Sequence, residues 1–238
     1  MMAPAVILFH GSGPSAAALE WGALAGLGGG AGVVFLYEGF AVGRISSVAT
    51  TSAVLTAVLP VLVGLALGDH LGVGAAIGIV IAIPAIALVS WQPAASEGET
   101  ETRGSGTLYG VLSGAGFALL FIALDRAGTR AGAWPLLSCE VSALIPIAPF
   151  AYLALRSAGL PSSRVTALSV AAGLLGGGGS ILFLAATKSG ELAVVAVLAA
   201  LYPVLTVLLA RVVLSERWTR TQAVGLVTAM VAVVLVTT

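Results

Sequence analysis

Charge is scarce in this sequence. Asp, Glu, Lys and Arg make up 8% of its 238 residues, whereas soluble domains carry about 25%. The ten basic and ten acidic residues cancel to a net charge of zero, so the chain lacks the basic excess of a nucleic-acid-binding protein and we expect no nucleic-acid partner. In place of charge it has 59% hydrophobic residues and a mean hydropathy of +1.11. These values predict a protein of the lipid bilayer.

Metal-binding and nucleotide-binding patterns are absent as well. Cys139 is the only cysteine, which excludes an intrachain disulfide and a cysteine-based metal site. His10 and His70 stand alone in the sequence, so we expect no metal and no other cofactor. The glycine runs at 28–30 and 176–179 lack the basic residue of a phosphate-binding loop, and we interpret them as close-packing helix surfaces.

What the sequence does have is a series of apolar segments separated by short polar turns. Apolar and polar residues do not alternate with a period of two, which is the pattern that would indicate a β-barrel. We therefore predict an all-α membrane protein, a polytopic bundle of about eight transmembrane helices. The predicted helices cover about residues 21–40, 45–67, 71–91, 107–124, 133–155, 166–187, 190–216 and 220–237. Residues 10–20 are predicted to be a loop, Asp125 and Arg126 to lie in a turn, and 92–106 to be a solvated polar linker.

An internal repeat relates the two ends of the chain. Residues 21–91, shifted by 147, fall on 168–238 without a gap. The aligned pairs include Gly29 with Gly176, Gly30 with Gly177, Gly32 with Gly179, Gly43 with Gly190, Asp69 with Glu216 and Gly78 with Gly225. Because five predicted crossings separate the start of one copy from the start of the other, the two copies are predicted to be inverted. Inverted repeats are common in secondary transporters, whose substrate site lies near the midplane.

The second copy carries a recognisable pattern: Gly190, then Tyr202-Pro203, then Leu214-Ser215-Glu216-Arg217, then Gly225. This pattern resembles the EamA-like half of the drug/metabolite transporter superfamily. The first copy fits more loosely, with Asp69 in place of the glutamate and Thr56 in place of the proline.

The resemblance implies ten helices in two five-helix repeats. We therefore expect residues 1–91 to be an incomplete N-terminal repeat without its first two helices, and residues 107–238 to be a complete C-terminal repeat. A misplaced start codon, a truncated gene and a natural short form remain open as reasons.

The function implied by the resemblance is that of an integral membrane permease rather than an enzyme. It would move a small metabolite or drug across the membrane by alternating access, as an exporter. The alternatives are a truncated, inactive or assembly-only membrane protein, and an intramembrane lipid-modifying enzyme. A small-molecule substrate and the lipid bilayer are the expected partners, and a homodimer stays open. We expect a multi-pass protein of the plasma membrane with cytoplasmic termini, although the distribution of loop arginines favours termini outside.

Several polar residues and one proline are candidates for the substrate pathway: Tyr37, Glu38, Thr50, Glu140, Tyr202 and Pro203. A carboxylate at membrane depth is costly, so Glu140 is a candidate for proton coupling or for binding a substrate amine. The alternative is that Glu140 lies near the interface, where it snorkels to the polar region or pairs with an arginine such as Arg130. Pro203 breaks a helical hydrogen bond, which makes it a candidate for a pathway or hinge position; the alternative is a simple packing kink.

The remaining candidates have simpler alternatives. Tyr37 and Glu38 end a helix and would recognise a polar metabolite or serve as interfacial anchors. Thr50 and its hydroxyl neighbours Thr51 and Ser52 would line the pathway or bond the preceding helical turn. Lys188 and Glu191 flank a turn and would be loop charges or a gate salt bridge.

Overall fold

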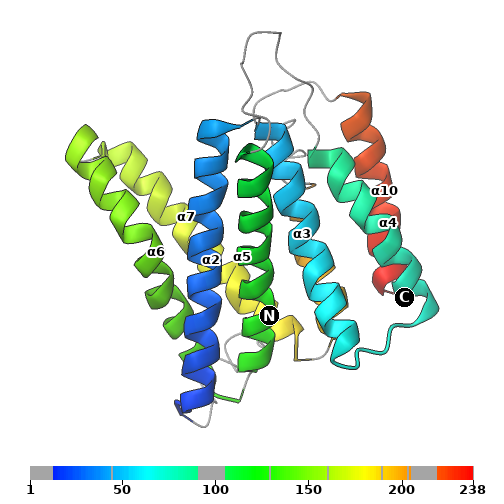
Figure 1. The fold of residues 1–238 in the computed structure, drawn as a ribbon. Coiled ribbons are helices and arrows are strands. Elements are labelled where there is room, and N and C mark those ends of the chain that lie inside the picture. The colour runs from blue at the N-terminus through cyan, green and yellow to red at the C-terminus, as the bar shows by residue number, and fades with distance from the viewer. Residues whose placement is uncertain are drawn as a thin grey trace. The chain divides into compact units, whose positions relative to one another are not determined.

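The computed structural model describes residues 13–43, 45–90, 105–128, 130–159, 161–188, 190–202, 204 and 219–237. Within these residues the chain is helical and contains no strand (Figure 1). Eight helices are described: α2 (Ala16–Val42), α3 (Ile45–Ala66), α4 (Val73–Ser90), α5 (Ser105–Ala127), α6 (Trp134–Ala158), α7 (Ser163–Ala186), α8 (Leu192–Ala200) and α10 (Arg220–Thr237).

The all-α fold class is confirmed, and several predicted boundaries are wrong, including the end of the linker at 106, because α5 begins at Ser105. The predicted loop at 10–20 ends early, because α2 begins at Ala16 and the Ser15 Oγ accepts a hydrogen bond of 3.2 Å from the Ala18 N–H. This bond satisfies one of the free N–H groups of the first turn. Asp125 and Arg126 belong to the last turn of α5 rather than to the following turn. The later part of the predicted helix at 190–216 lies outside the described residues.

Five of the described helices, α2, α3, α5, α6 and α7, are long and apolar enough to cross a membrane. The helices α4 and α10 are also apolar but shorter. A bilayer offers no hydrogen-bond partners to the backbone, so continuous helices of this length are the expected way for such segments to cross it. The chain is a multi-pass membrane protein.

The chain forms two compact units, residues 1–34 with 119–190 and residues 35–118 with 191–238. In the first unit, α2 packs on α6 along a stripe of glycines spaced four residues apart. A Cβ on Gly22, Gly26 or Gly30 would overlap the backbone carbonyl of Pro135, Cys139 or Ala143, respectively. The Ser138 Oγ and Ser142 Oγ donate to the carbonyls of Leu19 and Ala23, at 2.7 and 2.9 Å. Small residues and hydroxyl bonds hold membrane helices together in this way.

The prediction that the two glycine runs form close-packing surfaces holds for one run and not for the other. Gly29 and Gly30 pack closely, on Leu120 and on Ala143, as the close-packing interpretation of the run 28–30 requires. The run 176–179 on α7 has no atom within 4 Å of any added Cβ in the part of the chain that the structure describes. The close-packing interpretation therefore does not hold for the described surroundings of α7.

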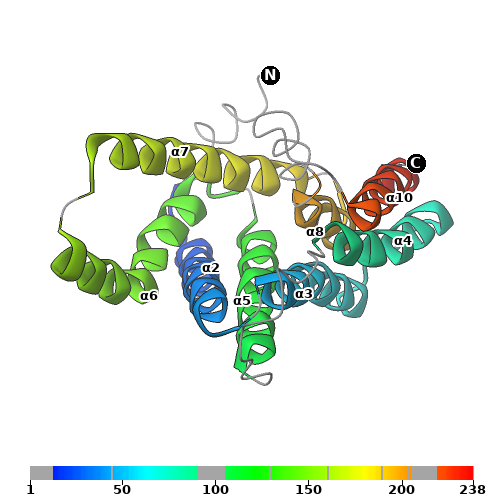
Figure 2. The same ribbon diagram turned by 90° about the horizontal axis from the view of Figure 1, so that it is seen from above.

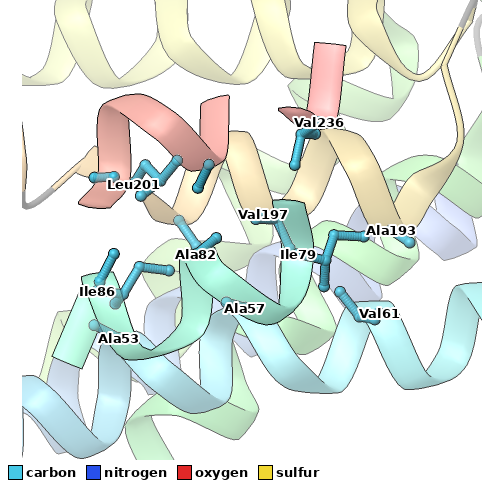
Figure 3. Close-up of a cluster of buried hydrophobic side chains, with 14 residues drawn as sticks. Ala53, Ala57, Val61, Ile79, Ala82, Ile86, Ala193, Val197, Leu201 and Val236 are labelled. Atoms are coloured by element: carbon cyan, nitrogen blue, oxygen red, sulfur yellow. The ribbon is translucent and has the colours of Figure 1, made fainter. Parts of the chain in front are cut away.

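The second unit contains the main hydrophobic core, made by α3, α4, α8 and α10. Figure 2 shows these four helices grouped together, and Figure 3 shows side chains from them meeting in one cluster. Alanine pairs related by the 147-residue shift contribute to this cluster: Ala53 with Ala200, Ala82 with Ala229, and Ala85 with Ala232. The core is therefore built from corresponding residues of the two copies.

Helix boundaries carry the same offset as the sequence. Each helix of the first copy begins 147 residues before its partner: α2 and α7 at Ala16 and Ser163, α3 and α8 at Ile45 and Leu192, α4 and α10 at Val73 and Arg220. The repeat is thus expressed in the secondary structure as well as in the residues.

Contacts between α4 and α10 are reciprocal. A Cβ on Gly78 would lie 2.7 Å from the backbone nitrogen of Val236, and a Cβ on Gly225 would lie 2.8 Å from that of Val89. The 147-residue shift relates Gly78 to Gly225 and Val89 to Val236. The two contacts are therefore equivalent under the repeat. The two helices therefore run antiparallel and meet through matching surfaces, as the two sides of a two-fold interface do.

The glycine stripe of α2 gives a paired test. Gly26→Ala should lower the free energy of unfolding by about 1–3 kcal/mol, because the added methyl overlaps the Cys139 carbonyl. Gly173→Ala, at the related position on α7, should leave stability unchanged or raise it, because no atom of the described residues lies within 4 Å of an added Cβ and Ala favours helix. Thermal denaturation of the purified variants in detergent measures both; an equal loss for the two variants would contradict the described α2–α6 contact.

Candidate functional site

A row of hydroxyl groups lies between α3 and α5 in the second unit. The Ser52 Oγ and Ser113 Oγ are 2.9 Å apart and share a hydrogen bond. The Thr56 Oγ1 donates to the Ser52 carbonyl at 2.8 Å. All three side chains are buried. Among the three hydroxyls considered in the sequence, Ser52 therefore bonds across to another helix rather than to its own preceding turn.

Glycines in α5 bring its backbone against this row. A Cβ on Gly110 would lie 3.0 Å from the Val48 carbonyl, and a Cβ on Gly114 would lie 2.8 Å from the Ser52 carbonyl. Ser113 stands next to Gly114 and so reaches Ser52. Ser113 was not among the residues predicted from the sequence; its position in an apolar segment between closely spaced glycines is the signal that could have identified it.

Thr50 has a buried hydroxyl for which the described part of the chain offers no partner. Its Oγ1 accepts and donates no hydrogen bond among the residues that the structure describes. The shift of 147 takes Thr50 to Val197, a fully buried residue of the core cluster. Thr50 thus places a hydroxyl where the other copy has a methyl group, and an unsatisfied buried hydroxyl costs about 1–3 kcal/mol. Buried polar groups that break a packing rule are frequent at functional sites.

The other predicted pathway residues have varied surroundings. Tyr37 is 67% exposed and makes an edge contact with Phe40, and Glu38 is half-buried. Glu140 is exposed, next to Cys139, which packs on Gly26. Tyr202 is 47% exposed, and Pro203 lies outside the described residues. No hydrogen bond or ring contact among the described residues joins two members of this set.

The turn charges include an acidic contact. Glu191 hydrogen-bonds to Asp69, and this bond is the main reason that the pKa of Glu191 lies above its ordinary value of 4.5. Lys188, the other predicted gate residue, is exposed. Asp69 also accepts a hydrogen bond of 2.9 Å from the Ala193 N–H at the start of α8. The repeat alignment identified Asp69 as an acidic turn residue, but its contacts with Glu191 and Ala193 could not be predicted from the sequence.

A double-substitution cycle tests the Ser52–Ser113 bond. Ser52→Ala or Ser113→Ala alone should destabilise the protein by about 1–3 kcal/mol, because the remaining buried hydroxyl loses its partner. The double variant should lose less than the sum of the two. Chemical denaturation in mixed micelles measures these differences, with Ser157→Ala as a control because Ser157 is exposed and bonds only its own helix. Additive losses would contradict the bond.

No three His, Cys, Asp or Glu residues among those described come together in a way that could hold a metal ion.

Comparison with known protein families gives a match over the second half of the chain. No curated protein matches the sequence. The model of the EamA-like transporter family matches residues 104–238, which is more than half of the chain. The chain belongs to the EamA-like transporter family.

Proposed function

We propose that the protein moves a small metabolite or drug across the plasma membrane by alternating access, in the direction of export. Family membership is the observation that carries the transport function. The reciprocal contact between α4 and α10 supports the mechanism, because two copies related by a two-fold axis can exchange conformations to open either side of the membrane. In this proposal the two copies are inverted repeats.

Transport itself is tested in proteoliposomes that contain the purified chain. Counterflow is measured for a panel of amino acids, nucleosides and lipophilic organic cations. At least one class should exchange faster than in protein-free liposomes. Exchange at the protein-free rate for every class would contradict the proposal and would favour an assembly-only role.

We propose that Thr50 contacts the substrate, because a buried hydroxyl without a hydrogen-bond partner lowers the stability of the protein when no ligand is bound. Its neighbours on the same helix, Ser52 and Thr56, already have hydrogen-bond partners. A polar group on the substrate would supply the partner that Thr50 lacks. The equivalent residue Val197 cannot do so, which makes the proposed pathway asymmetric between the two copies.

Thr50→Val separates this role from simple packing. The substitution should raise stability by about 1–3 kcal/mol, because it removes an unsatisfied buried hydroxyl. It should also slow counterflow of the transported class by about tenfold, as expected for one lost hydrogen bond to a substrate. Thr166→Val, whose hydroxyl bonds its own helix on α7, is the control and should leave counterflow unchanged. Raised stability with unchanged counterflow would assign Thr50 a packing role only.

Proton coupling is proposed for Glu140. Glu140→Gln should abolish the pH dependence of counterflow while leaving exchange at equal pH on both sides measurable, because a neutral amide cannot carry a proton. Glu20→Gln, which changes an exposed carboxylate near the start of α2, is the matched control. An unchanged pH dependence in Glu140→Gln would end this assignment.

A further inference from the structure

The turn after α3 is fixed by its own backbone. The N–H of Asp69 donates to the Gly64 carbonyl at 2.9 Å, and the N–H of Gly68 donates to the Leu65 carbonyl at 3.2 Å. These are the two bonds of a Schellman motif, which ends a helix with a left-handed residue. Gly68 supplies that residue, with a φ of +100°. The backbone of Asp69 is therefore held in a defined position beside the last turn of α3.

From this position Asp69 caps a second helix. Its Oδ2 accepts the hydrogen bond of 2.9 Å from the Ala193 N–H, one of the N–H groups that a helix start leaves without an intrahelical acceptor. Glu191 occupies the N-cap position of α8 but makes no capping bond with its side chain. Gly64 permits the close approach, because a Cβ there would overlap the Asp69 Oδ2 and lie 3.2 Å from the Ala193 nitrogen.

Glu191 joins the contact as a second carboxyl. The hydrogen bond to Asp69 requires a proton on one of the two groups, and two ionised carboxylates at this separation repel. Asp69 raises the pKa of Glu191, while the backbone N–H and the charge of His70 act in the opposite direction. Both groups lie in turns outside the membrane-spanning segments.

We propose that Asp69 and Glu191 form a proton-dependent latch between α3 and α8. With one shared proton, the two side chains hydrogen-bond and Asp69 caps α8. With both side chains ionised, they repel and the cap loosens. The latch joins corresponding helices of the two copies, because α3 and α8 are related by the 147-residue shift. It rests on the described contacts and does not depend on the proposed transport function.

The related positions of the repeat have a different charge pattern. The shift takes Asp69 to Glu216 and Glu191 to Arg44, which both lie outside the described residues. An acidic and a basic residue attract each other at neutral pH, whereas two acidic residues need a shared proton to do so. Arginine is therefore the informative replacement for Glu191, since it would convert the latch to a form that is insensitive to pH.

Among the residues that the structure describes, few other ionisable groups surround the latch. His70 follows Asp69 and faces Glu191, and Lys188 precedes Glu191 on the turn from α7. The helix α4 has no ionisable residue. In α10 the one ionisable residue is Arg220, and it lies toward the end of α4 that is remote from Asp69, because Gly225 packs on Val89. His70 is thus the group that must be separated from Glu191 experimentally.

The direction of the pH effect follows from the raised pKa of Glu191. A carboxyl whose pKa is higher in the folded protein binds its proton more tightly there, so it favours the closed latch at low pH. This contribution is complete below the ordinary value of 4.5 and is lost as the pH rises through the raised pKa. The latch therefore loosens as the pH increases.

Hydrogen–deuterium exchange of the full chain in nanodiscs tests the latch. The protection of peptides that span Ala193 is measured between pH 5 and pH 8 and corrected for the intrinsic exchange rate. Wild-type protection should fall about two- to fivefold over this range, the scale of an exposed charge interaction. Glu191→Gln and Glu191→Arg should keep high protection at every pH, because the amide and the guanidinium both donate to Asp69 without titrating.

Two further variants complete the test. Asp69→Ala should lose protection at every pH, and His70→Gln should retain the wild-type dependence. The proposal is overturned if wild-type protection does not change with pH, if Glu191→Gln keeps the wild-type dependence, or if His70→Gln abolishes it. Should Asp69→Ala fail to fold, the Glu191 variants still decide the question, because each retains the capping carboxylate.

Discussion

The close approach of helix backbones at glycine is the constraint on which the described packing depends. Lipid chains are as apolar as leucine, so membrane helices gain little by burying apolar side chains and must instead pack closely. Gly78 and Gly225 meet this requirement between α4 and α10, and Gly22, Gly26 and Gly30 meet it between α2 and α6. In each case a single methyl group would reach the backbone of the neighbouring helix. Hydrogen bonds such as that of Ser142 to Ala23 then become short enough to form.

The reciprocal contact of α4 and α10 also explains why departures from the repeat are informative. Two copies that pack through matching surfaces need matching residues there. A residue that differs between the copies therefore marks a position where packing accepts the change or where function requires it. Thr50, the repeat counterpart of Val197, has a buried hydroxyl without a hydrogen-bond partner among the described residues. Asp69 and Glu191 are two acids where the related positions have an acid and a base. We connect the first difference with substrate and the second with the control of α8. Both give one copy a chemical property that the other lacks.

The sequence predicted the helices and the repeat because both depend on patterns within the chain. Apolar length determined the spans, and aligned glycines such as Gly78 and Gly225 determined the offset that the helix boundaries also show. Helix ends were less predictable: Ser15 caps α2, which begins five residues before the predicted start at residue 21, and Asp125 remains within α5. Partners between helices were not predictable, since the Ser52–Ser113 bond joins residues 61 apart and the Asp69–Ala193 bond joins residues 124 apart. Tyr37, Glu38, Glu140, Tyr202 and Pro203 stay predictions.

Disulfide cross-linking of α4 to α10 tests the inverted relation of the two copies most directly. Replacing Cys139, the only cysteine, gives a background into which pairs of cysteines are introduced. We predict rapid cross-linking of cysteines at positions 82 and 232, and equally of cysteines at positions 85 and 229. These alanine positions already carry a Cβ in the core cluster, and the antiparallel contacts of Gly78 with Val236 and of Val89 with Gly225 bring them to the same level. Cysteines at 89 and 236 should not cross-link. Cross-linking of this last pair would show α4 and α10 packed in parallel and would contradict the inverted repeat.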